Sequence, residues 1–414
     1  MNFSYWFSKR ISLRKGTTAS TTTGAIIAVA GVALALMVME LTLAVVAGFK
    51  HEIERKVMGF DATITVLPPY NYYTGVSEGE MTVNDTLRTI ITDALPGAVP
   101  VETFRRHAIM KTDSDFVAVE CFAYGDAHDR SFEAGNLVRG GFTESDDSIV
   151  ISETIARQLG IDTASRAYLY FFIDGKPKAR RAYVSGIYES NFGEYDKSVI
   201  YTSLPFLQTL GADSARVTGI AIEGLEYGDI DLIADDAADL QRALIDHYRL
   251  GDVANVYPVT SILERGAVFF SWLDLLDTNV VVIFILMVCV AVFTLISSLF
   301  IIILDRVSTI GILRALGASR SVVSRAFVFV ALKIVGIGML IGNALALGII
   351  WLQHATHFLS LNPEMYYLDS VPFDLSWRAA LLLNVGVIVG AWLILILPAK
   401  VAARINPAST MRYE

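Results

Sequence analysis

The sequence predicts an α-helical membrane protein with four transmembrane helices and a large extracytoplasmic α+β domain between helices one and two. Of its 414 residues, 54% are hydrophobic and 18% charged, with a mean hydropathy of +0.51. Soluble domains rarely combine such values. Four apolar stretches approach or exceed the roughly 20 residues that a bilayer-spanning helix needs. A long stretch of mixed strand and helix patterns separates the first from the second.

The spans define the predicted boundaries along the chain. These are an amphipathic N-terminus at 1–23, spans at 24–48, 278–304, 326–352 and 377–397, the α+β domain at 49–277, a loop with a short helix at 305–325, a short loop at 353–376 and a tail at 398–414. The apolar part of the first span is longer than the roughly 15 residues of a signal-peptide core, and no small-residue cleavage site follows it. We therefore interpret it as a retained span.

Basic residues near the spans predict the orientation, because cytoplasmic loops are enriched in Lys and Arg. The loop 353–376 contains neither, whereas three other segments contain several: Lys9, Arg10, Arg14 and Lys15 before the first span, Arg306, Arg314 and Arg320 in the loop 305–325, and Lys400, Arg404 and Arg412 in the tail. Both termini and the loop 305–325 are thus predicted to be cytoplasmic. The segment 49–277, with 20 basic and 36 acidic residues, is predicted outside; its acidity argues against nucleic acid as a partner.

The first span has two features that suggest specific contacts. Gly24/Ala28 and Gly31/Ala35 have the small-xxx-small spacing that lets helices approach closely, as have Gly338/Gly342 in the third span. Glu40 is an acid inside the span, and intramembrane acids commonly face a polar cavity or partner. The alternative is that Glu40 extends outward to the membrane surface.

The segment 49–277 alternates strand and helix patterns and is long enough to form its own core. We predict strands at 61–67, 99–111, 116–124, 198–202, 216–223 and 253–257, helices at 83–95 and 235–248, a strand running into a helix at 148–160, and a hairpin of 168–173 with 179–187 around Asp174-Gly175.

The motifs of the common enzyme classes are not found. The chain has no phosphate-binding Gly-x-x-x-x-Gly-Lys-Ser/Thr loop, no Gly-x-Ser-x-Gly and no His-Glu-x-x-His. Cys121 and Cys289 fall in different parts of the predicted topology and do not suggest a disulfide. His354 and His357 either share a metal or pack at the membrane interface. We predict no cofactor, no metal and no catalytic residue in this chain.

The segment 305–325 predicts a short amphipathic helix with defined ends. Ser308 or Thr309 is expected at its N-cap, Gly317 in the left-handed conformation after it, and Ser319 at the cap of the next helix. Ile310, Leu313 and Leu316 are spaced to share one face. Such a helix either lies against lipid head groups, docks on another protein or is a plain connection.

With this topology, the sequence IGILRALGAS at Ile310–Ser319 resembles the coupling segment of FtsX/MacB-type ABC transporter permeases, which contacts the ATPase. Further stretches are similar to the lipoprotein-releasing LolC/LolE type: Gly48-Phe49 with Glu52-Ile53, Gly59-Phe60 and Ala62–Val66, then Leu361–Leu375, and finally Pro398–Ala403 with Asn406-Pro407 and Met411–Glu414.

The resemblance implies a permease subunit that extracts lipoproteins from the outer leaflet of the bacterial inner membrane. The implied partners are an ABC ATPase subunit that binds ATP and Mg, a second permease chain, identical or homologous, membrane lipid and the lipoprotein. The ATPase-coupling residues would be Ile310, Gly311, Leu313, Arg314, Leu316 and Gly317, and the cavity through which substrate enters would include Glu40, Met37 and Leu43. The short hairpin turn at Asp174–Lys178 lacks a long hook, so docking of a periplasmic lipoprotein carrier is left open.

Two other functions share this topology. An FtsX-like chain would act as a transmembrane mechanotransmitter that regulates a periplasmic cell-wall hydrolase. A MacB-like efflux permease would normally carry a fused ATPase domain ahead of the first span, where this sequence has only a short segment.

Overall fold

The computed structural model describes residues 19–71, 79–113, 115–143, 145–173, 175–211, 215–227, 230–248, 255–305 and 307–402. Residues 1–18 of the predicted amphipathic N-terminus and most of the C-terminal motif lie outside these residues. The chain divides into two compact units. We call them the helical unit (residues up to 51, 273–360 and from 370) and the α+β domain (52–272 and 361–369).

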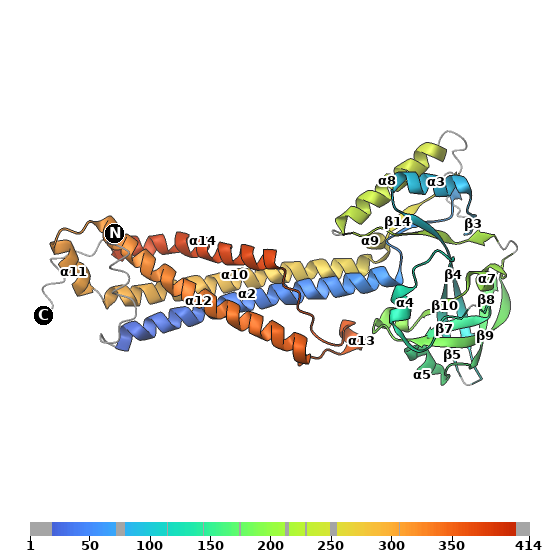
Figure 1. Ribbon diagram of the computed structural model, residues 1–414, viewed down its shortest axis with the longest axis horizontal. Helices are drawn as coiled ribbons and strands as arrows, with labels where there is room; N and C mark the ends of the chain where they lie inside the picture. The colour runs from blue at the N-terminus through green and yellow to red at the C-terminus, as the bar shows by residue number, and fades with distance from the viewer. Residues whose placement is uncertain are drawn as a thin grey trace. The chain divides into compact units, whose positions relative to one another are not determined.

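Within the described ranges, four helices are long and apolar enough to cross a membrane, as predicted (Figure 1). They are α2 (Ala19–Phe60), α10 (Ala267–Leu304), α12 (Arg320–Thr356) and α14 (Trp377–Ala402). All four extend beyond the predicted apolar spans, and the longest extensions are in α2, which continues past residue 48, and in α10, which begins before residue 278. The extension of α2, FKHEIERKVMGF, is too polar for a span but is made mainly of residues that favour a helix and contains no proline.

Small residues let the helices of the helical unit pack closely. A Cβ atom added to Gly342 of α12 would lie 2.8 Å from the Ala33 carbonyl oxygen of α2. A Cβ atom on Gly31 of α2 would lie 2.6 Å from Cγ2 of Thr294 in α10. The Ser298 hydroxyl of α10 also donates a hydrogen bond of 2.7 Å to the Gly24 carbonyl. The predicted small-xxx-small positions therefore lie at helix contacts.

The α+β domain is built on a ten-stranded mixed sheet among the described residues. Its order is β14 (Val259–Ser261), β1 (Ile64–Val66), β12 (Gly219–Glu223), β4 (Val99–Lys111), β5 (Phe116–Tyr124), β10 (Val199–Thr202), β7 (Ser148–Ser152), β9 (Lys176–Tyr188) and β6 (Leu137–Gly140), with β8 (Arg166–Ile173) pairing with β4 and β9. Two small ladders pair β11 (Arg216–Val217) with β3 (Met81–Thr82) and β13 (Asn255–Val256) with β2 (Tyr70–Asn71).

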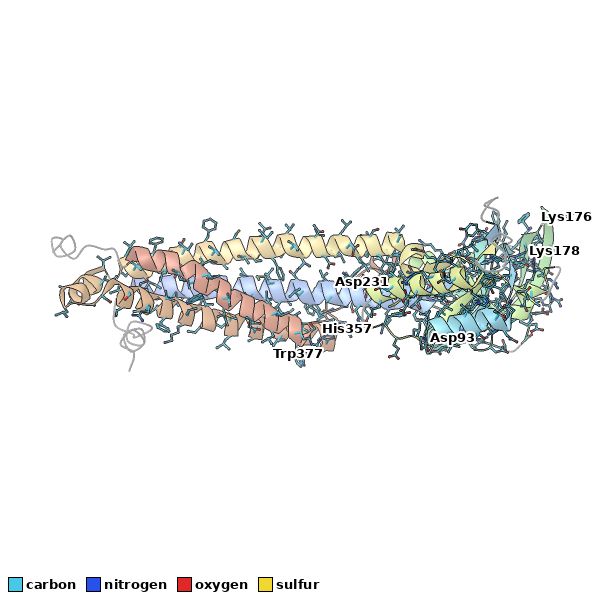
Figure 2. All side chains as sticks on the ribbon, turned by 90° about the horizontal axis from the view of Figure 1, so that it is seen from above. Asp93, Lys176, Lys178, Asp231, His357 and Trp377 are labelled. Carbon is cyan, nitrogen blue, oxygen red and sulfur yellow. The ribbon has the colours of Figure 1, made fainter. Side chains whose placement is uncertain are left out.

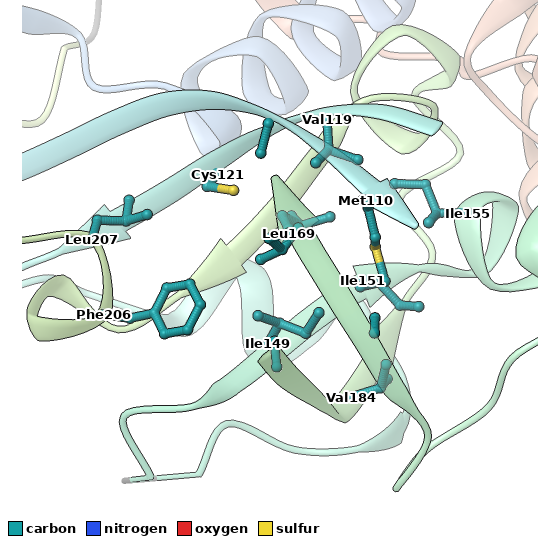
Figure 3. Close-up of a cluster of buried hydrophobic side chains, with 14 of the residues drawn as sticks. Met110, Val119, Cys121, Ile149, Ile151, Ile155, Leu169, Val184, Phe206 and Leu207 are labelled. Carbon is teal, nitrogen blue, oxygen red and sulfur yellow. The ribbon is translucent and has the colours of Figure 1, made fainter. Parts of the chain in front are cut away.

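One face of this sheet buries the main apolar core of the domain (Figure 3). Met110, Cys121, Ile149 and Leu169 come from four different strands and are fully buried. Two short helices pack against them: α5 (Glu153–Leu159) and α7 (Leu204–Gln208). The other helices of the domain are α3 (Asp85–Ala94), α4 (Ser131–Gly135), α6 (Gly193–Asp196), α8 (Asp231–Tyr248), α9 (Ile262–Arg265) and α13 (Pro363–Tyr366).

Most predicted elements of the domain are found. The strands predicted at 99–111 and 116–124 have those bounds, and the segment 148–160 is a strand followed by a helix capped by the Ser152 hydroxyl. The strand predicted at 216–223 is divided at Thr218, whose hydroxyl oxygen accepts a hydrogen bond of 2.8 Å from the Arg105 amide. The division gives β11 and β12, which belong to different sheets.

A buried carboxylate joins the two places where the long helices meet the domain. Asp61 directly follows α2, and Arg265 lies two residues before α10. The Asp61 side chain is 6% exposed and accepts hydrogen bonds from Arg105 of β4 and, at 3.0 Å, from Arg265. Burial alone would raise the pKa of Asp61, but the two guanidinium groups outweigh burial and lower it below its usual value.

Replacement of this carboxylate tests how much it contributes to the stability of the domain. Asp61→Asn leaves two largely buried arginines without a negative partner, so we expect a loss of about 3–5 kcal/mol in the free energy of unfolding. Because the folded pKa of Asp61 is depressed, this contribution is present above the unfolded pKa, near 4, and disappears as the pH falls through the folded pKa. Thermal and denaturant unfolding of the full chain in detergent measures both effects.

The control for Asp61→Asn is Asp239→Asn, which removes an exposed carboxylate paired with Arg242. Exposed pairs contribute between zero and about 1 kcal/mol. Equal destabilisation by the two substitutions would contradict the role assigned to Asp61.

Candidate functional site

The segment between α10 and α12 forms the short helix that the sequence predicts. Helix α11 spans Val307–Ala315, and Gly317 follows it with φ of +94°, the left-handed conformation expected there. The predicted N-caps are wrong, because α11 begins at Val307 and Ser308 and Thr309 lie inside it. Ser319 stands at the N-cap of α12 as predicted, although its hydroxyl contacts the Ser321 hydroxyl instead of a backbone amide.

The residues predicted to contact an ATPase do not share one environment. Ile310 is 1% exposed and belongs to the core of the helical unit together with Val323 and Phe327. Gly311 is buried, Leu316 is 80% exposed and Gly317 is exposed, while Leu313 and Arg314 lie within α11. Among the side chains of this segment that the structure describes, the large apolar ones that are exposed are Ile312 and Leu316, at i and i+4. The sequence analysis missed Ile312, because the spacing of Ile310, Leu313 and Leu316 suggested a different face.

The intramembrane acid Glu40 belongs to a polar cluster of three helices. The Glu40 side chain of α2 is 1% exposed, and its Oε1 accepts a hydrogen bond of 3.1 Å from Asn384 of α14. Asn384 and Asn343 of α12 donate to each other's side-chain oxygen at 2.9 and 3.1 Å. Glu40 Oε2 has no hydrogen-bond partner among the described residues. Asn343 and Asn384 were missed, although single amides in otherwise apolar spans are a recognisable signal.

An apolar cavity of about 310 Å³ lies between α10 and α14, and residues of α2 also line it. The lining residues are Val32, Ala35, Leu36, Met39, Val288, Ala291, Val292, Leu295, Val335, Leu382, Leu383, Gly386, Val387, Gly390, Ala391 and Ile394. Of the predicted cavity residues, Glu40 adjoins the lining residue Met39 in the sequence, whereas Met37 and Leu43 are half-buried elsewhere on α2. Gly386 and Gly390 help to create the space, because a Cβ atom on either would meet no atom within 4 Å.

The two histidines at the end of α12 contact the loop that follows it. His354 Nε2 lies 3.0 Å from the Phe373 carbonyl oxygen, and His357 Nδ1 lies 3.2 Å from the Ser370 hydroxyl. Within the described residues, no group of three His, Cys, Asp or Glu side chains is arranged to hold a metal ion. These contacts favour the packing interpretation of the pair.

The β8–β9 hairpin carries an exposed aromatic and basic surface. Tyr168 of β8 pairs with Lys111 of β4 on one side and Arg181 of β9 on the other. Phe116 and Phe172, on the same group of strands, are 64% and 63% exposed. Strand β8 ends at residue 173 and β9 begins at residue 176, so the hairpin connection is as short as the sequence predicts. Lys176 and Lys178 lie at this end of the domain in Figure 2.

Comparisons with known proteins agree with this architecture. Residues 281–407 match the FtsX-like permease C-terminal family. The chain is 24% identical over 404 residues to the lipoprotein-releasing system transmembrane protein LolC of Xylella fastidiosa (strain 9a5c), covering 93% of this chain and 92% of that protein. It is 23% identical over 408 residues to the corresponding LolE of Haemophilus influenzae, covering 92% of each.

Solved structures with some similarity include two extracellular or periplasmic domains. The extracellular domain of the noncanonic ABC-type transporter YknZ is 13% identical, with a TM-score of 0.33 and coverage of 49% of this chain and 100% of that one. The periplasmic region of MacB from Actinobacillus actinomycetemcomitans is 11% identical, with a TM-score of 0.33 and coverage of 50% and 91%.

The C-terminal family match and the similarity along most of the chain agree with the four apolar helices and the domain inserted between the first two. Residues 281–407 thus match the FtsX-like permease C-terminal family, and the chain is similar over most of its length to the lipoprotein-releasing transmembrane proteins LolC and LolE.

Proposed function

We propose that this chain is the membrane subunit of an ABC transporter that extracts lipoproteins from the outer leaflet of the bacterial inner membrane. The observation that carries the proposal is the similarity to LolC and LolE proteins over 92–93% of the chain. ATP is hydrolysed by a separate ATPase subunit. A second permease chain completes the transporter, both termini face the cytoplasm, and the α+β domain faces the periplasm.

The apolar cavity supports a lipidated substrate. Moving an acyl chain out of the bilayer costs about 0.8 kcal/mol per CH₂ group, which explains why release needs ATP. The cavity offers apolar surface from α2, α10 and α14 at the depth of the spans. In this proposal one acyl chain of the lipid anchor occupies the cavity during extraction. The hydrogen bonds among Glu40, Asn343 and Asn384 hold α2, α12 and α14 in the register that shapes its wall.

The hairpin surface supports a soluble acceptor for the released lipoprotein. Aromatic and arginine side chains are enriched in protein interfaces. Around Tyr168 this surface is basic, although the segment 49–277 as a whole is acidic. We therefore propose that a periplasmic carrier with an acidic docking face binds the exposed surface of β8 and β9.

Reconstitution tests the proposed function. The chain, its ATPase and a fluorescent lipoprotein are placed in proteoliposomes, and lipoprotein appearing in solution is measured with and without ATP and a soluble carrier. We expect ATP-dependent release that the carrier increases, and a smaller carrier effect with Arg181→Glu. ATP hydrolysis without any lipoprotein release would reject the proposal and favour a signalling role of the mechanotransmitter kind.

Filling the apolar cavity should block the substrate without unfolding the protein. Gly386→Leu places a side chain into open space, so we expect normal insertion and ATPase binding but release lowered about tenfold or more. The matched control is Gly348→Leu on α12, where a Cβ atom also meets nothing within 4 Å but which does not line the cavity. Similar release by Gly386→Leu and Gly348→Leu would exclude the cavity as an acyl-chain site.

The exposed side chain of Leu316, directly after α11, should be required for ATPase binding. Leu316→Asp introduces a charge at a position that is 80% exposed, so the fold should tolerate it while apolar docking is lost. We expect co-purification of the ATPase to fall at least tenfold. Leu359→Asp, a 40% exposed position after α12, is the control for introducing a charge. Undiminished co-purification with Leu316→Asp would show that the ATPase docks elsewhere.

A further inference from the structure

The segment Leu361–Asp369 lies between α12 and α14 in the sequence but belongs to the α+β domain. It contains the short helix α13, which packs against α6. The chain on either side of it, up to residue 360 and from residue 370, belongs to the helical unit. The α+β domain therefore has a third covalent link to the spans, in addition to α2 and α10. Nothing in the local sequence pattern distinguishes this segment from an ordinary loop.

Lys56 holds this segment on the domain. Its Nζ donates hydrogen bonds of 2.8 Å to the Ser190 carbonyl oxygen and 2.7 Å to the Tyr367 carbonyl oxygen. The two acceptors are 134 and 311 residues away in the sequence. One ammonium group thus joins the end of α2, the loop before α6 and the segment Leu361–Asp369. Charge-assisted bonds of this kind are stronger than those between neutral groups.

Side chains on both sides of Lys56 strengthen the attachment. The Tyr367 ring lies 4.8 Å from that of Phe192 and 6.2 Å from that of Phe269, between centroids. Phe269 is near the start of α10, and Phe192 also stacks on Phe60 of α2 at 5.9 Å between centroids, so the same aromatic group reaches both helices. The Asn191 amide also donates a hydrogen bond of 3.0 Å to an Asp369 carboxylate oxygen.

Two residues of this junction have an unusual backbone conformation. Tyr367 has φ of +61° and Asn191 has φ of +56°. A left-handed conformation is unfavourable for a side chain as bulky as tyrosine, and surrounding contacts must maintain it. The Lys56 hydrogen bond to the Tyr367 carbonyl is such a contact. The junction is thus a specific attachment and differs from a loop that merely rests on a surface.

We propose that Leu361–Asp369 is a tether through which displacement of α12 and α14 is transmitted to the α+β domain, with Lys56 as the residue that positions it. In this mechanism α2 and α10 transmit one part of the movement driven by the ATPase, and the tether transmits a second part. The coupling of ATP hydrolysis to release depends on both. The experiment below that measures lipoprotein release rests on the proposed function.

The tether itself can be tested without any transport. Asn191→Cys and Asp369→Cys are introduced into the full chain with Cys121→Ala and Cys289→Ala, and a short bifunctional thiosulfonate joins the two new thiols. We expect efficient cross-linking, and at least threefold slower cross-linking when Lys56→Met is added. An unchanged rate would show that Lys56 does not hold the segment.

The coupling is tested in the reconstituted transporter with the same variants. Lys56→Met should retain ATP hydrolysis but release at least fivefold fewer lipoproteins per ATP, whereas Arg55→Met, at an exposed neighbouring position, should behave like the wild type. The thiosulfonate bridge between residues 191 and 369 should restore release in Lys56→Met, and reduction should abolish it again. A purely structural role for Lys56 would give no such reversible rescue.

The outcomes separate this inference from the proposed function. A wild-type chain that hydrolyses ATP with its partner but releases no lipoprotein would reject the proposed function, whereas the cross-linking rates would still test the tether. Normal release per ATP by Lys56→Met, or a bridged variant that stays defective, would overturn the coupling role.

Discussion

The pairing of Asp61 with two arginines is the interaction on which the α+β domain depends most. A carboxylate this deeply buried is stable only when it is paired and hydrogen bonded. Its partners come from β4, near the middle of the sheet, and from α9, directly before α10. Asp61, which directly follows α2, is thereby bound to Arg265, which lies two residues before α10. The domain cannot shift either attachment without exposing or separating buried charges.

The helical unit is stabilised in a different way, and the difference matters for a transporter. Close approach at Gly338, Gly342 and Gly31 fixes α2 against α12 and α10, and the Glu40 cluster adds hydrogen bonds between three helices. In the most apolar stretch of α10, however, only 6% of the residues are buried within this chain, compared with 39% in α2. Because α10 packs so sparsely, an apolar cavity opens between it and α14. Sparse packing of that kind is compatible with a helix that moves during a transport cycle.

Local patterns predicted much of the secondary structure, because hydropathy, strand alternation and glycine positions act within a few residues. They predicted the four spans, strands β4 and β5 and the left-handed Gly317. They could not predict pairs such as Lys56 with Tyr367 or Glu40 with Asn384, which are separated by 311 and 344 residues and meet only in the folded chain. Spacing alone also could not predict that Ile310 is buried in the core of the helical unit while Leu316 is exposed.

Lys56 lies near the end of α2 and Asp61 directly follows this helix, yet the two residues restrain different parts of the chain. Asp61 fixes the two helices that border the domain in the sequence, whereas Lys56 fixes a segment that connects the other pair of spans. A domain held only through α2 and α10 could respond to their movement alone. With the third attachment, it can also respond to a displacement of α12 relative to α2. Since α11 connects α10 to α12, an ATPase that docks on α11 would act on both routes at once.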